Sequence, residues 1–209
     1  MKLLYSLASA WLLLLAPLAY GQSTILDHET AGYVDEGDIE FSIYNYGGNP
    51  DIRIGINDAE VFIRHDTANA AIAGYKADIG ESLAVYGGLG IEPLPAGGAT
   101  NTLLAGVTYT QNKKELLLNA NAEMVNDSVN NILLLKLAGY YILTDGKPGN
   151  IRAGLSIDAD LSSACTVDCT VTKIGVNWEV KKNIVFEAAV YNSLSGLQLP
   201  GTFNLKLTF

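Results

Sequence analysis

Residues that carry enzyme chemistry are scarce in this chain. Its 209 residues include two cysteines and two histidines, His28 and His65. It has no Gly-x-Ser-x-Gly elbow, phosphate-binding loop or zinc-binding motif. Basic residues are also few, since 13 Lys and Arg stand against 22 Asp and Glu, for a net charge of −9. These absences predict a protein that is not an enzyme, needs no metal or cofactor, and does not bind nucleic acid.

Long apolar runs are also scarce, because only one occurs, over residues 3–18. Lys2 gives this run a positively charged start, and small residues at 19 and 21 suit a signal peptidase. Pro17 and two serines interrupt the run, so it lacks the roughly 18 uninterrupted apolar residues of a spanning helix. We therefore expect residues 1–21 to be a signal peptide that is cleaved before Gln22.

The rest of the chain has no apolar run that could cross a membrane as a helix. Any membrane span after residue 21 must therefore be made of strands, which have to close into a barrel because lipid offers no partner to an open edge. Residues 22–37 form an acidic segment without a clear apolar period. We expect this segment to be a loose periplasmic extension, with a short plug inside the barrel as the alternative.

Residues 38–209 alternate between apolar and polar positions in runs separated by turn residues, which is the period of a β-strand. The central runs have about 9–11 residues, the length that crosses hydrocarbon at a tilt. The predicted turns alternate between short connections, such as Asn57-Asp58 and 181–183, and longer ones, such as 92–100, 125–131, 161–169 and 193–199. Aromatic residues lie near predicted strand ends, including Tyr46, Tyr109, Tyr141 and Phe209.

This pattern predicts an all-β fold, a transmembrane antiparallel up-and-down β-barrel with 12 strands over residues 38–209. The runs 51–56 and 59–65 are short. If they lie outside the wall, the barrel has 10 strands, and both numbers place the two ends of the barrel on one side. A soluble periplasmic β-protein also alternates and remains the alternative to a membrane protein.

The last ten residues put Phe203, Leu205, Leu207 and Phe209 on one face of a strand. This strand resembles the closing strand of bacterial outer-membrane β-barrels, whose terminal Phe is read by the barrel-assembly machinery. No particular family within that class matches. The resemblance implies a location in the bacterial outer membrane, contact with its lipid and lipopolysaccharide, and a porin-like or structural role. It leaves the oligomeric state open.

A barrel of 10 or 12 strands lies between one filled by side chains and one with an aqueous channel. Charged residues of both signs fall on the predicted inner face, so we expect ion pairs that partly close the lumen, in preference to a selective pathway. Alternation also suggests that Lys136 and Arg152 lie within reach of Glu123 and Asp158. The predicted lumen charges are Arg53, Arg64, Lys76, Glu115, Glu123, Lys136, Arg152, Asp158, Lys173, Glu179, Glu187 and Lys206.

The two cysteines, Cys165 and Cys169, lie in one predicted external loop. In an exported protein we expect them to form a structural disulfide, because no histidine accompanies them as a metal ligand and redox pairs normally have two intervening residues. His65, at a strand end, supports one further hypothesis, an enzyme acting on lipid or lipopolysaccharide at the barrel rim. An ordinary loop histidine is the better interpretation.

Overall fold

A computed structural model describes residues 24–25, 28–44, 50–65, 71–93, 97–113, 115–126, 131–144, 150–162, 165, 169–181, 183–193 and 196–209. Strands make up its regular secondary structure in these ranges, and none of them contains a helix long and apolar enough to cross a membrane. Two short strands, β1 (Thr24–Ile25) and β2 (His28–Glu29), pair with each other. All other strands join in one sheet.

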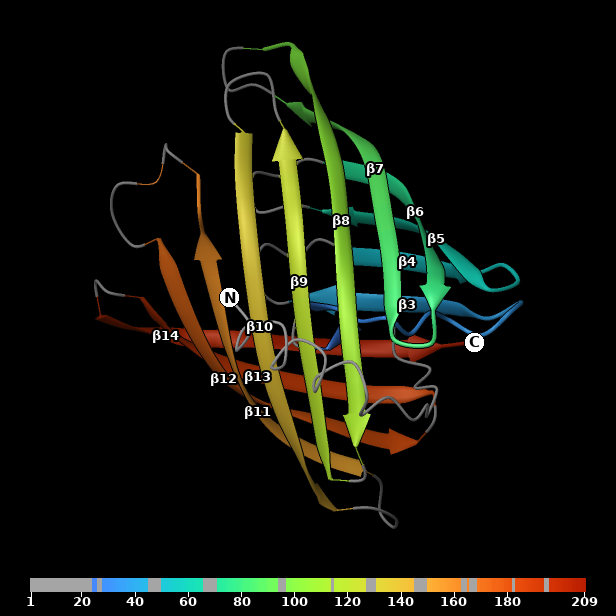
Figure 1. Ribbon diagram of the computed structural model, residues 1–209, viewed down its shortest axis with the longest axis vertical. Coiled ribbons are helices and arrows are strands. Elements are labelled where there is room, and N and C mark those ends of the chain that lie inside the picture. The colour runs from blue at the N-terminus through green and yellow to red at the C-terminus, as the bar shows by residue number, and fades with distance from the viewer. Residues whose placement is uncertain are drawn as a thin grey trace, which may run out of the picture.

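That sheet is a closed antiparallel barrel of twelve strands, in which each strand pairs with its neighbours in sequence and β14 pairs with β3 (Figure 1). The predicted twelve strands are therefore confirmed, and the short hairpin of β4 and β5 belongs to the wall. The strands are β3 (Ile39–Tyr44), β4 (Pro50–Gly55), β5 (Ala59–His65), β6 (Ala71–Gly80), β7 (Leu83–Pro93), β8 (Ala99–Lys113), β9 (Leu116–Asn126), β10 (Asn131–Thr144), β11 (Asn150–Asp160), β12 (Thr170–Lys181), β13 (Ile184–Ser193) and β14 (Gly196–Thr208).

The first and last barrel strands meet at one end of the barrel, which we call the terminus end. There the backbone N–H of Ile39 donates to the carbonyl of Phe209, and the N–H of Phe209 donates to the carbonyl of Ile39, both at 3.0 Å. These two hydrogen bonds close the seam between β3 and β14. We call the opposite end, where β7 turns into β8 and β11 into β12, the loop end.

The connections agree only in part with the predicted alternation of short and long turns. Asn57 and Asp58 form the expected tight turn, with Asn57 at a φ of 51° and the Ile56 N–H donating to the Ala59 carbonyl at 2.9 Å. The predicted loop at 193–199 is wrong, because Ser193 pairs with Gly196. The predicted loop at 92–100 is shorter than expected, because β7 extends to Pro93 and β8 begins at Ala99.

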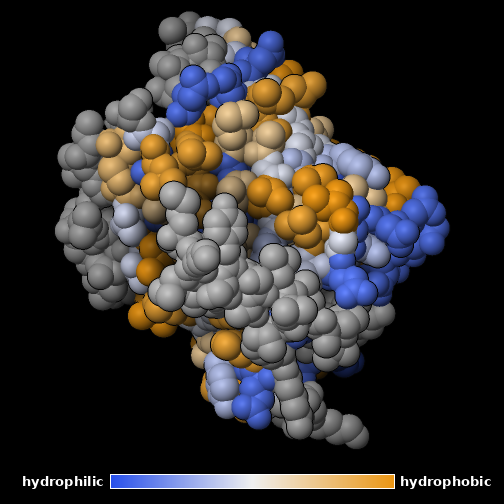
Figure 2. Space-filling model, in the orientation of Figure 1, coloured by the Kyte–Doolittle hydropathy of each residue, from blue (hydrophilic) through white to orange (hydrophobic). Residues whose placement is uncertain are grey.

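The strands place apolar side chains outside and polar ones inside. Leu89, Leu155 and Ile174 are 70%, 48% and 60% exposed on the outer face, whereas Arg53, Glu60 and Arg152 are at most 1% exposed. Figure 2 shows broad hydrophobic areas on the described surface of one face of the molecule. The predicted face of each strand is therefore the observed one, with the inner residues buried by the closed wall.

The acidic segment before β3 is not a loose extension where it is described. Thr30, Ala31 and Val34 are buried, and the Ala31 N–H donates to Oγ1 of Thr110 on the inner face of β8 at 2.7 Å. A parallel bridge joins Glu36 to Gly55 of β4. Within the predicted segment 22–37, residues 30–36 therefore pack against the inner wall, as in the alternative of a short plug. The missed factor is the set of backbone hydrogen-bonding partners that the inner wall offers to this segment.

Candidate functional site: the barrel lumen

A first group of buried charges surrounds Glu60 near the terminus end. Glu60 is fully buried on β5, and its Oε1 pairs with Nη1 of Arg53 on β4 and with Nζ of Lys76 on β6 at 3.0 Å. Its other oxygen accepts the backbone N–H of Val34 from the plug segment at 3.1 Å. The Arg53 guanidinium also lies over the Phe62 ring, 5.3 Å from its centroid. Glu60 thus ties three wall strands to the segment inside them.

A second group surrounds Glu123 and reaches across part of the lumen. Oε2 of Glu123 on β9 pairs with Nη2 of Arg64 on β5 at 3.0 Å and accepts the Tyr86 hydroxyl at 2.9 Å. Lys136 on β10 lies beside its other oxygen, with Nζ 3.6 Å from Oε1. Because β6, β7 and β8 separate β5 from β9 in the wall, the Arg64–Glu123 pair bridges the interior. This bridge narrows any path along the barrel axis.

A third group follows β12, β13 and β14. The two carboxylate oxygens of Glu187 accept the side-chain amides of Asn177 and Asn204 at 2.7 and 2.9 Å, and Nζ of Lys206 lies 3.3 Å from Oε2. All four residues are buried. One ammonium group and two amides therefore surround the buried carboxylate of Glu187, so little of its negative charge is left to attract an ion in the lumen.

Arg152 on β11 continues this third group. Its Nη1 donates to Oδ1 of Asn177 at 3.0 Å, and its Nη2 lies 3.6 Å from Oε2 of Glu179. Asp158, nearer the loop end of β11, pairs with Lys173 at 2.8 Å. The suggested grouping of Lys136 and Arg152 with Glu123 and Asp158 is therefore right around Lys136, which pairs with Glu123 and lies directly opposite Asp158 in the register of β10 and β11. Arg152 lies six residues from Asp158 along β11, a separation that alternation does not report.

Eleven of the twelve predicted lumen charges are buried or half-buried and take part in the ion pairs above. Glu115 is the exception. It precedes β9 in the turn from β8, is exposed, and accepts the hydroxyl of outward-facing Tyr141 at 3.4 Å. Treating Glu115 as part of the strand was wrong, because β9 begins one residue later and the carboxylate stays at the rim.

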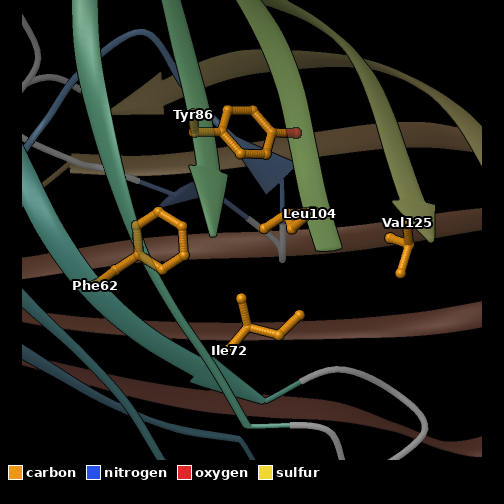
Figure 3. Close-up of a cluster of buried hydrophobic side chains, with 5 residues drawn as sticks. All are labelled: Phe62, Ile72, Tyr86, Leu104 and Val125. Atoms are coloured by element: carbon orange, nitrogen blue, oxygen red, sulfur yellow. The ribbon is translucent and has the colours of Figure 1, made fainter. Parts of the chain in front are cut away.

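The charge pattern did not predict the buried apolar residues that share the lumen with the ion pairs. Figure 3 shows one cluster drawn from β5 to β9. Ile132 of β10 packs against this cluster. A second cluster includes Tyr140 of β10 and Ala189 of β13, so it too reaches between strands that are not neighbours. These residues occupy inner positions between the charged ones. The first cluster contains Phe62, Ile72, Tyr86, Leu104 and Val125.

Three of the buried aromatic rings lie against a glycine on the next strand. The registered pairs are Phe62 with Gly74, Tyr86 with Gly106, and Tyr140 with Gly154. In each pair a Cβ added to the glycine would overlap the facing ring. The glycine therefore leaves the space that the ring fills. The sequence does show aromatic and glycine residues at inner positions. Which ring lies against which glycine depends on how neighbouring strands are aligned, and the sequence does not show that alignment.

The mouth at the terminus end is acidic. Tyr33 of the plug segment donates its hydroxyl to Oδ1 of Asp58 at 3.3 Å. Burial raises the pKa of the Tyr33 phenol above its ordinary value, and the negative charges of Asp58, Asp78 and Asp35 raise it further. Tyr33 therefore stays protonated at neutral pH and remains a hydrogen-bond donor.

Among the described residues, no group of three or more His, Cys, Asp or Glu side chains is placed to hold a metal ion. His65 is the last residue of β5, paired with Ala71 at the loop end.

The predicted disulfide between Cys165 and Cys169 is present in the connection from β11 to β12. Tyr46, one of the aromatic residues expected near a strand end, lies outside the described ranges.

Comparison with known protein families, curated proteins and solved structures finds no match for this chain.

Proposed function

We propose that this chain is exported, loses residues 1–21, and spans a bacterial outer membrane as an integral β-barrel with a filled lumen. The observation that carries the proposal is the reversed distribution of polarity. The side chains enclosed by the wall include many that are charged, while large apolar side chains such as Leu89, Ile91 and Leu143 are more than half exposed around it. Soluble proteins rarely leave broad apolar surfaces in water, whereas lipid-facing barrels require them.

Strand length supports the same environment. The strands β6 to β13 have between 10 and 15 residues, which meets the roughly 9–11 that a tilted strand needs to cross hydrocarbon. The described parts of β3, β4 and β5 have six or seven residues. On this proposal the lipid-facing band is tallest beside β8 to β10 and lowest beside β3 to β5.

Aromatic side chains near the terminus end fit a membrane interface. Tyr141 is 50% exposed and Phe209 is 75% exposed. Trp178, Phe186 and Phe203 form a tilted row across the outer faces of β12, β13 and β14, with successive ring centroids 6.1 Å apart. Tyr and Trp rings favour the headgroup level, where one part of the ring is apolar and the other is wet. These aromatic residues fit an interface at the terminus end, and on the resemblance to outer-membrane barrels we take it to be the periplasmic one.

The filled lumen favours a structural role or a narrow porin-like one. The ion pairs of Glu60, Glu123 and Glu187 and the apolar clusters occupy inner positions along much of the wall. On this proposal the partners are outer-membrane lipid and lipopolysaccharide, with barrel-assembly machinery acting during insertion. No enzymatic step is assigned to the chain.

Vesicle insertion tests the membrane assignment. The mature chain, unfolded in urea, should float with phosphatidylcholine vesicles after dilution and should stay with them after an alkaline wash. It should also migrate faster on gels before heating than after, as closed barrels do. A mature chain that folds and stays soluble without detergent or lipid would contradict the proposal and support the soluble periplasmic alternative.

Conductance in planar bilayers tests the filled lumen separately. The inserted protein should pass little current, because buried pairs and rings stand across the interior. Large, stable currents typical of open porins would overturn the filled lumen and leave the membrane assignment intact.

A further inference from the structure

The segment before β3 has a built seat on the inner wall at the terminus end. Its backbone N–H groups at Ala31 and Val34 donate to Thr110 Oγ1 on β8 and to Glu60 Oε2 on β5. Gly55 of β4 completes the seat, since it accepts the Gly37 N–H at 3.1 Å and donates to the Asp38 carbonyl at 3.0 Å. One segment thus contacts three strands that line the mouth.

The negative charge in the seat is balanced even without the segment. The charge of Glu60 is already paired with Arg53 and Lys76, both part of the wall. The segment adds a backbone N–H to that pair and removes no charge from it. Its departure would therefore leave a paired carboxylate, a threonine hydroxyl and the end of β4, all of which water can solvate. The segment is held by these polar contacts and by the burial of Ala31 and Val34, while the strands around it are held by ladders of backbone hydrogen bonds.

Gly55 shows that the wall is shaped around the segment. A Cβ at this position would overlap the carbonyl oxygens of Val34 and Asp35, and these backbone atoms are its nearest neighbours. At the end of the segment, Gly37 adopts a φ of +84°, and the Asp38 N–H donates to the Asp35 carbonyl at 2.9 Å. This turn lets the chain leave the lumen and enter β3.

A separate obstacle lies farther along the lumen. Leu104 belongs to the apolar cluster and is on the same strand as Thr110, six residues or about 20 Å away. The Arg64–Glu123 pair reaches across the interior beside that cluster. Tyr86 links the two, because it belongs to the cluster and its hydroxyl donates to Glu123. The hydrogen bonds that seat the segment do not involve the residues of this second obstacle, although Arg53, which pairs with Glu60, also lies over the Phe62 ring of the cluster.

We propose that residues 30–38 are a removable strap that closes a vestibule at the terminus end, while the apolar cluster and the Arg64–Glu123 bridge close the lumen beyond it. Release of the strap would give polar molecules from that side access to Glu60 and Thr110 without opening a channel. The inference deepens the proposed filled lumen, but the strap itself can be tested in detergent, without a membrane.

The test uses Gly55→Ala, which should displace the strap, with Gly80→Ala as its matched control. Gly80 ends β6, and a Cβ added there meets nothing within 4 Å. Thr110→Cys serves as a probe beneath the strap. It weakens one seat contact, because a thiol accepts the Ala31 N–H less well than a hydroxyl does, so rates are compared only among variants that carry it. Leu104→Cys serves as a probe beyond the strap. The native cysteines are bridged and do not react. The reagent is a charged methanethiosulfonate applied to the full mature chain folded in detergent.

Cys at 110 should react slowly alone and with Gly80→Ala, and about tenfold faster or more with Gly55→Ala, since the rate follows the open population. Cys at 104 should stay unreactive in every background. Equal rates at 110 with and without Gly55→Ala, in folded protein, would overturn the strap. Exposure of Cys at 104 by Gly55→Ala would overturn the second closure.

A second variant serves if Gly55→Ala does not fold. Ala31→Pro together with Val34→Pro removes the strap's donors to Thr110 and Glu60 and leaves the wall residues unchanged. It should also raise the rate at 110 by about tenfold, by the same reasoning. An unchanged rate would overturn the proposal. Failure of vesicle insertion would count against the membrane assignment alone, because these rates are measured in detergent.

Discussion

The outer and inner faces of the barrel wall are one residue apart along each strand, yet they are built by different chemistry. On β9, Leu118 and Ala120 point outward, while Asn119 and Asn121 are buried and bonded to Thr108. The outer face is uniform and apolar, so many apolar residues suit it. The inner face depends on particular partners, because each buried polar atom needs its own donor or acceptor.

The difference teaches where substitutions should matter and in what way. On the outer face the cost of a change should follow its polarity and its depth in the bilayer. On the inner face the cost should follow the partner that is left behind, whatever the polarity of the new side chain. Each prediction below changes one of these faces, the seam that closes the barrel, or the disulfide in a connection, and has a control on the same wall where the chain offers one.

Loss of the closing seam should have the largest effect. Deleting Phe209, or replacing it with Asp, should sharply reduce the amount of barrel in the outer membrane. The deletion removes the two hydrogen bonds to Ile39, and either change removes the apolar side chain that follows β14. Immunoblots of isolated outer membranes measure this amount. Normal levels of the deletion variant would contradict the assigned role of the last strand, Phe203, Leu205, Leu207 and Phe209, in assembly.

Breaking a buried charge group should cost the next largest amount. Glu187→Ala leaves Lys206 buried without its carboxylate, and such a loss typically costs about 3–5 kcal/mol. Glu115→Ala is the control, because that carboxylate is exposed at the rim, and it should leave stability unchanged. Urea unfolding in vesicles measures both free energies of unfolding. Equal losses would contradict the prediction that the buried carboxylate contributes more to stability than the exposed one.

Charge on the outer face should come next. Arg at Leu118, Leu135 or Leu155 should lower the free energy of unfolding by about 2–4 kcal/mol where the position lies near the bilayer midplane. Arg at Asn119 meets the polar interior and should show no dependence on bilayer thickness. Unfolding in vesicles of two thicknesses checks this. The same response at Leu118 and Asn119 would show that the two faces have been confused.

A smaller effect is expected where an inner ring lies against a glycine. Gly154→Ala should cost about 1–3 kcal/mol, the usual range for overpacking, because its Cβ would overlap the Tyr140 ring. Gly139→Ala is the control on the outer face, where the nearest atom is Leu118 Cδ2 at 3.5 Å. Free energies of unfolding measured as above should separate the two variants, and a harmless Gly154→Ala would argue against tight packing of that ring.

The smallest effect belongs to the disulfide between Cys165 and Cys169. The ring it closes is short, so its reduction should cost roughly 2 kcal/mol or less, at the low end for disulfides. The barrel should keep its heat-dependent gel mobility after reduction. Mass spectrometry of protein taken from the envelope should show the bridge, and two free thiols there would contradict it.

Alternation sufficed to predict the wall, because the period of a strand and the inner or outer side of each residue are local properties. It placed Leu155 outside and Arg152 inside without any knowledge of neighbours. It also found the short β4–β5 hairpin, since the Asn57-Asp58 turn has a strong local signature. The wrong end of β9 at Glu115 shows its limit, because strand ends are set by pairing.

The contents of the lumen were harder to predict, because they depend on register and on contacts between distant strands. Phe62 lies between polar inner positions in the sequence, and only its pairing with Gly74 explains why a ring fits there. The Arg64–Glu123 bridge joins strands that are not neighbours, so no local pattern reports it. The plug segment has no period, and its place follows from partners on β4, β5 and β8.

The most direct test of the reversed polarity is a scan of spin labels along β9, from Leu116 to Asn126, in vesicles. Oxygen, which concentrates in lipid, and a water-soluble nickel chelate serve as the two relaxing agents. Labels at Leu118, Ala120 and Ala122 should be relaxed by oxygen and hardly by nickel, and labels at Asn119, Asn121 and Glu123 should respond weakly to both. A scan without this two-residue period, or strong nickel accessibility at the outward positions, would contradict an integral membrane barrel.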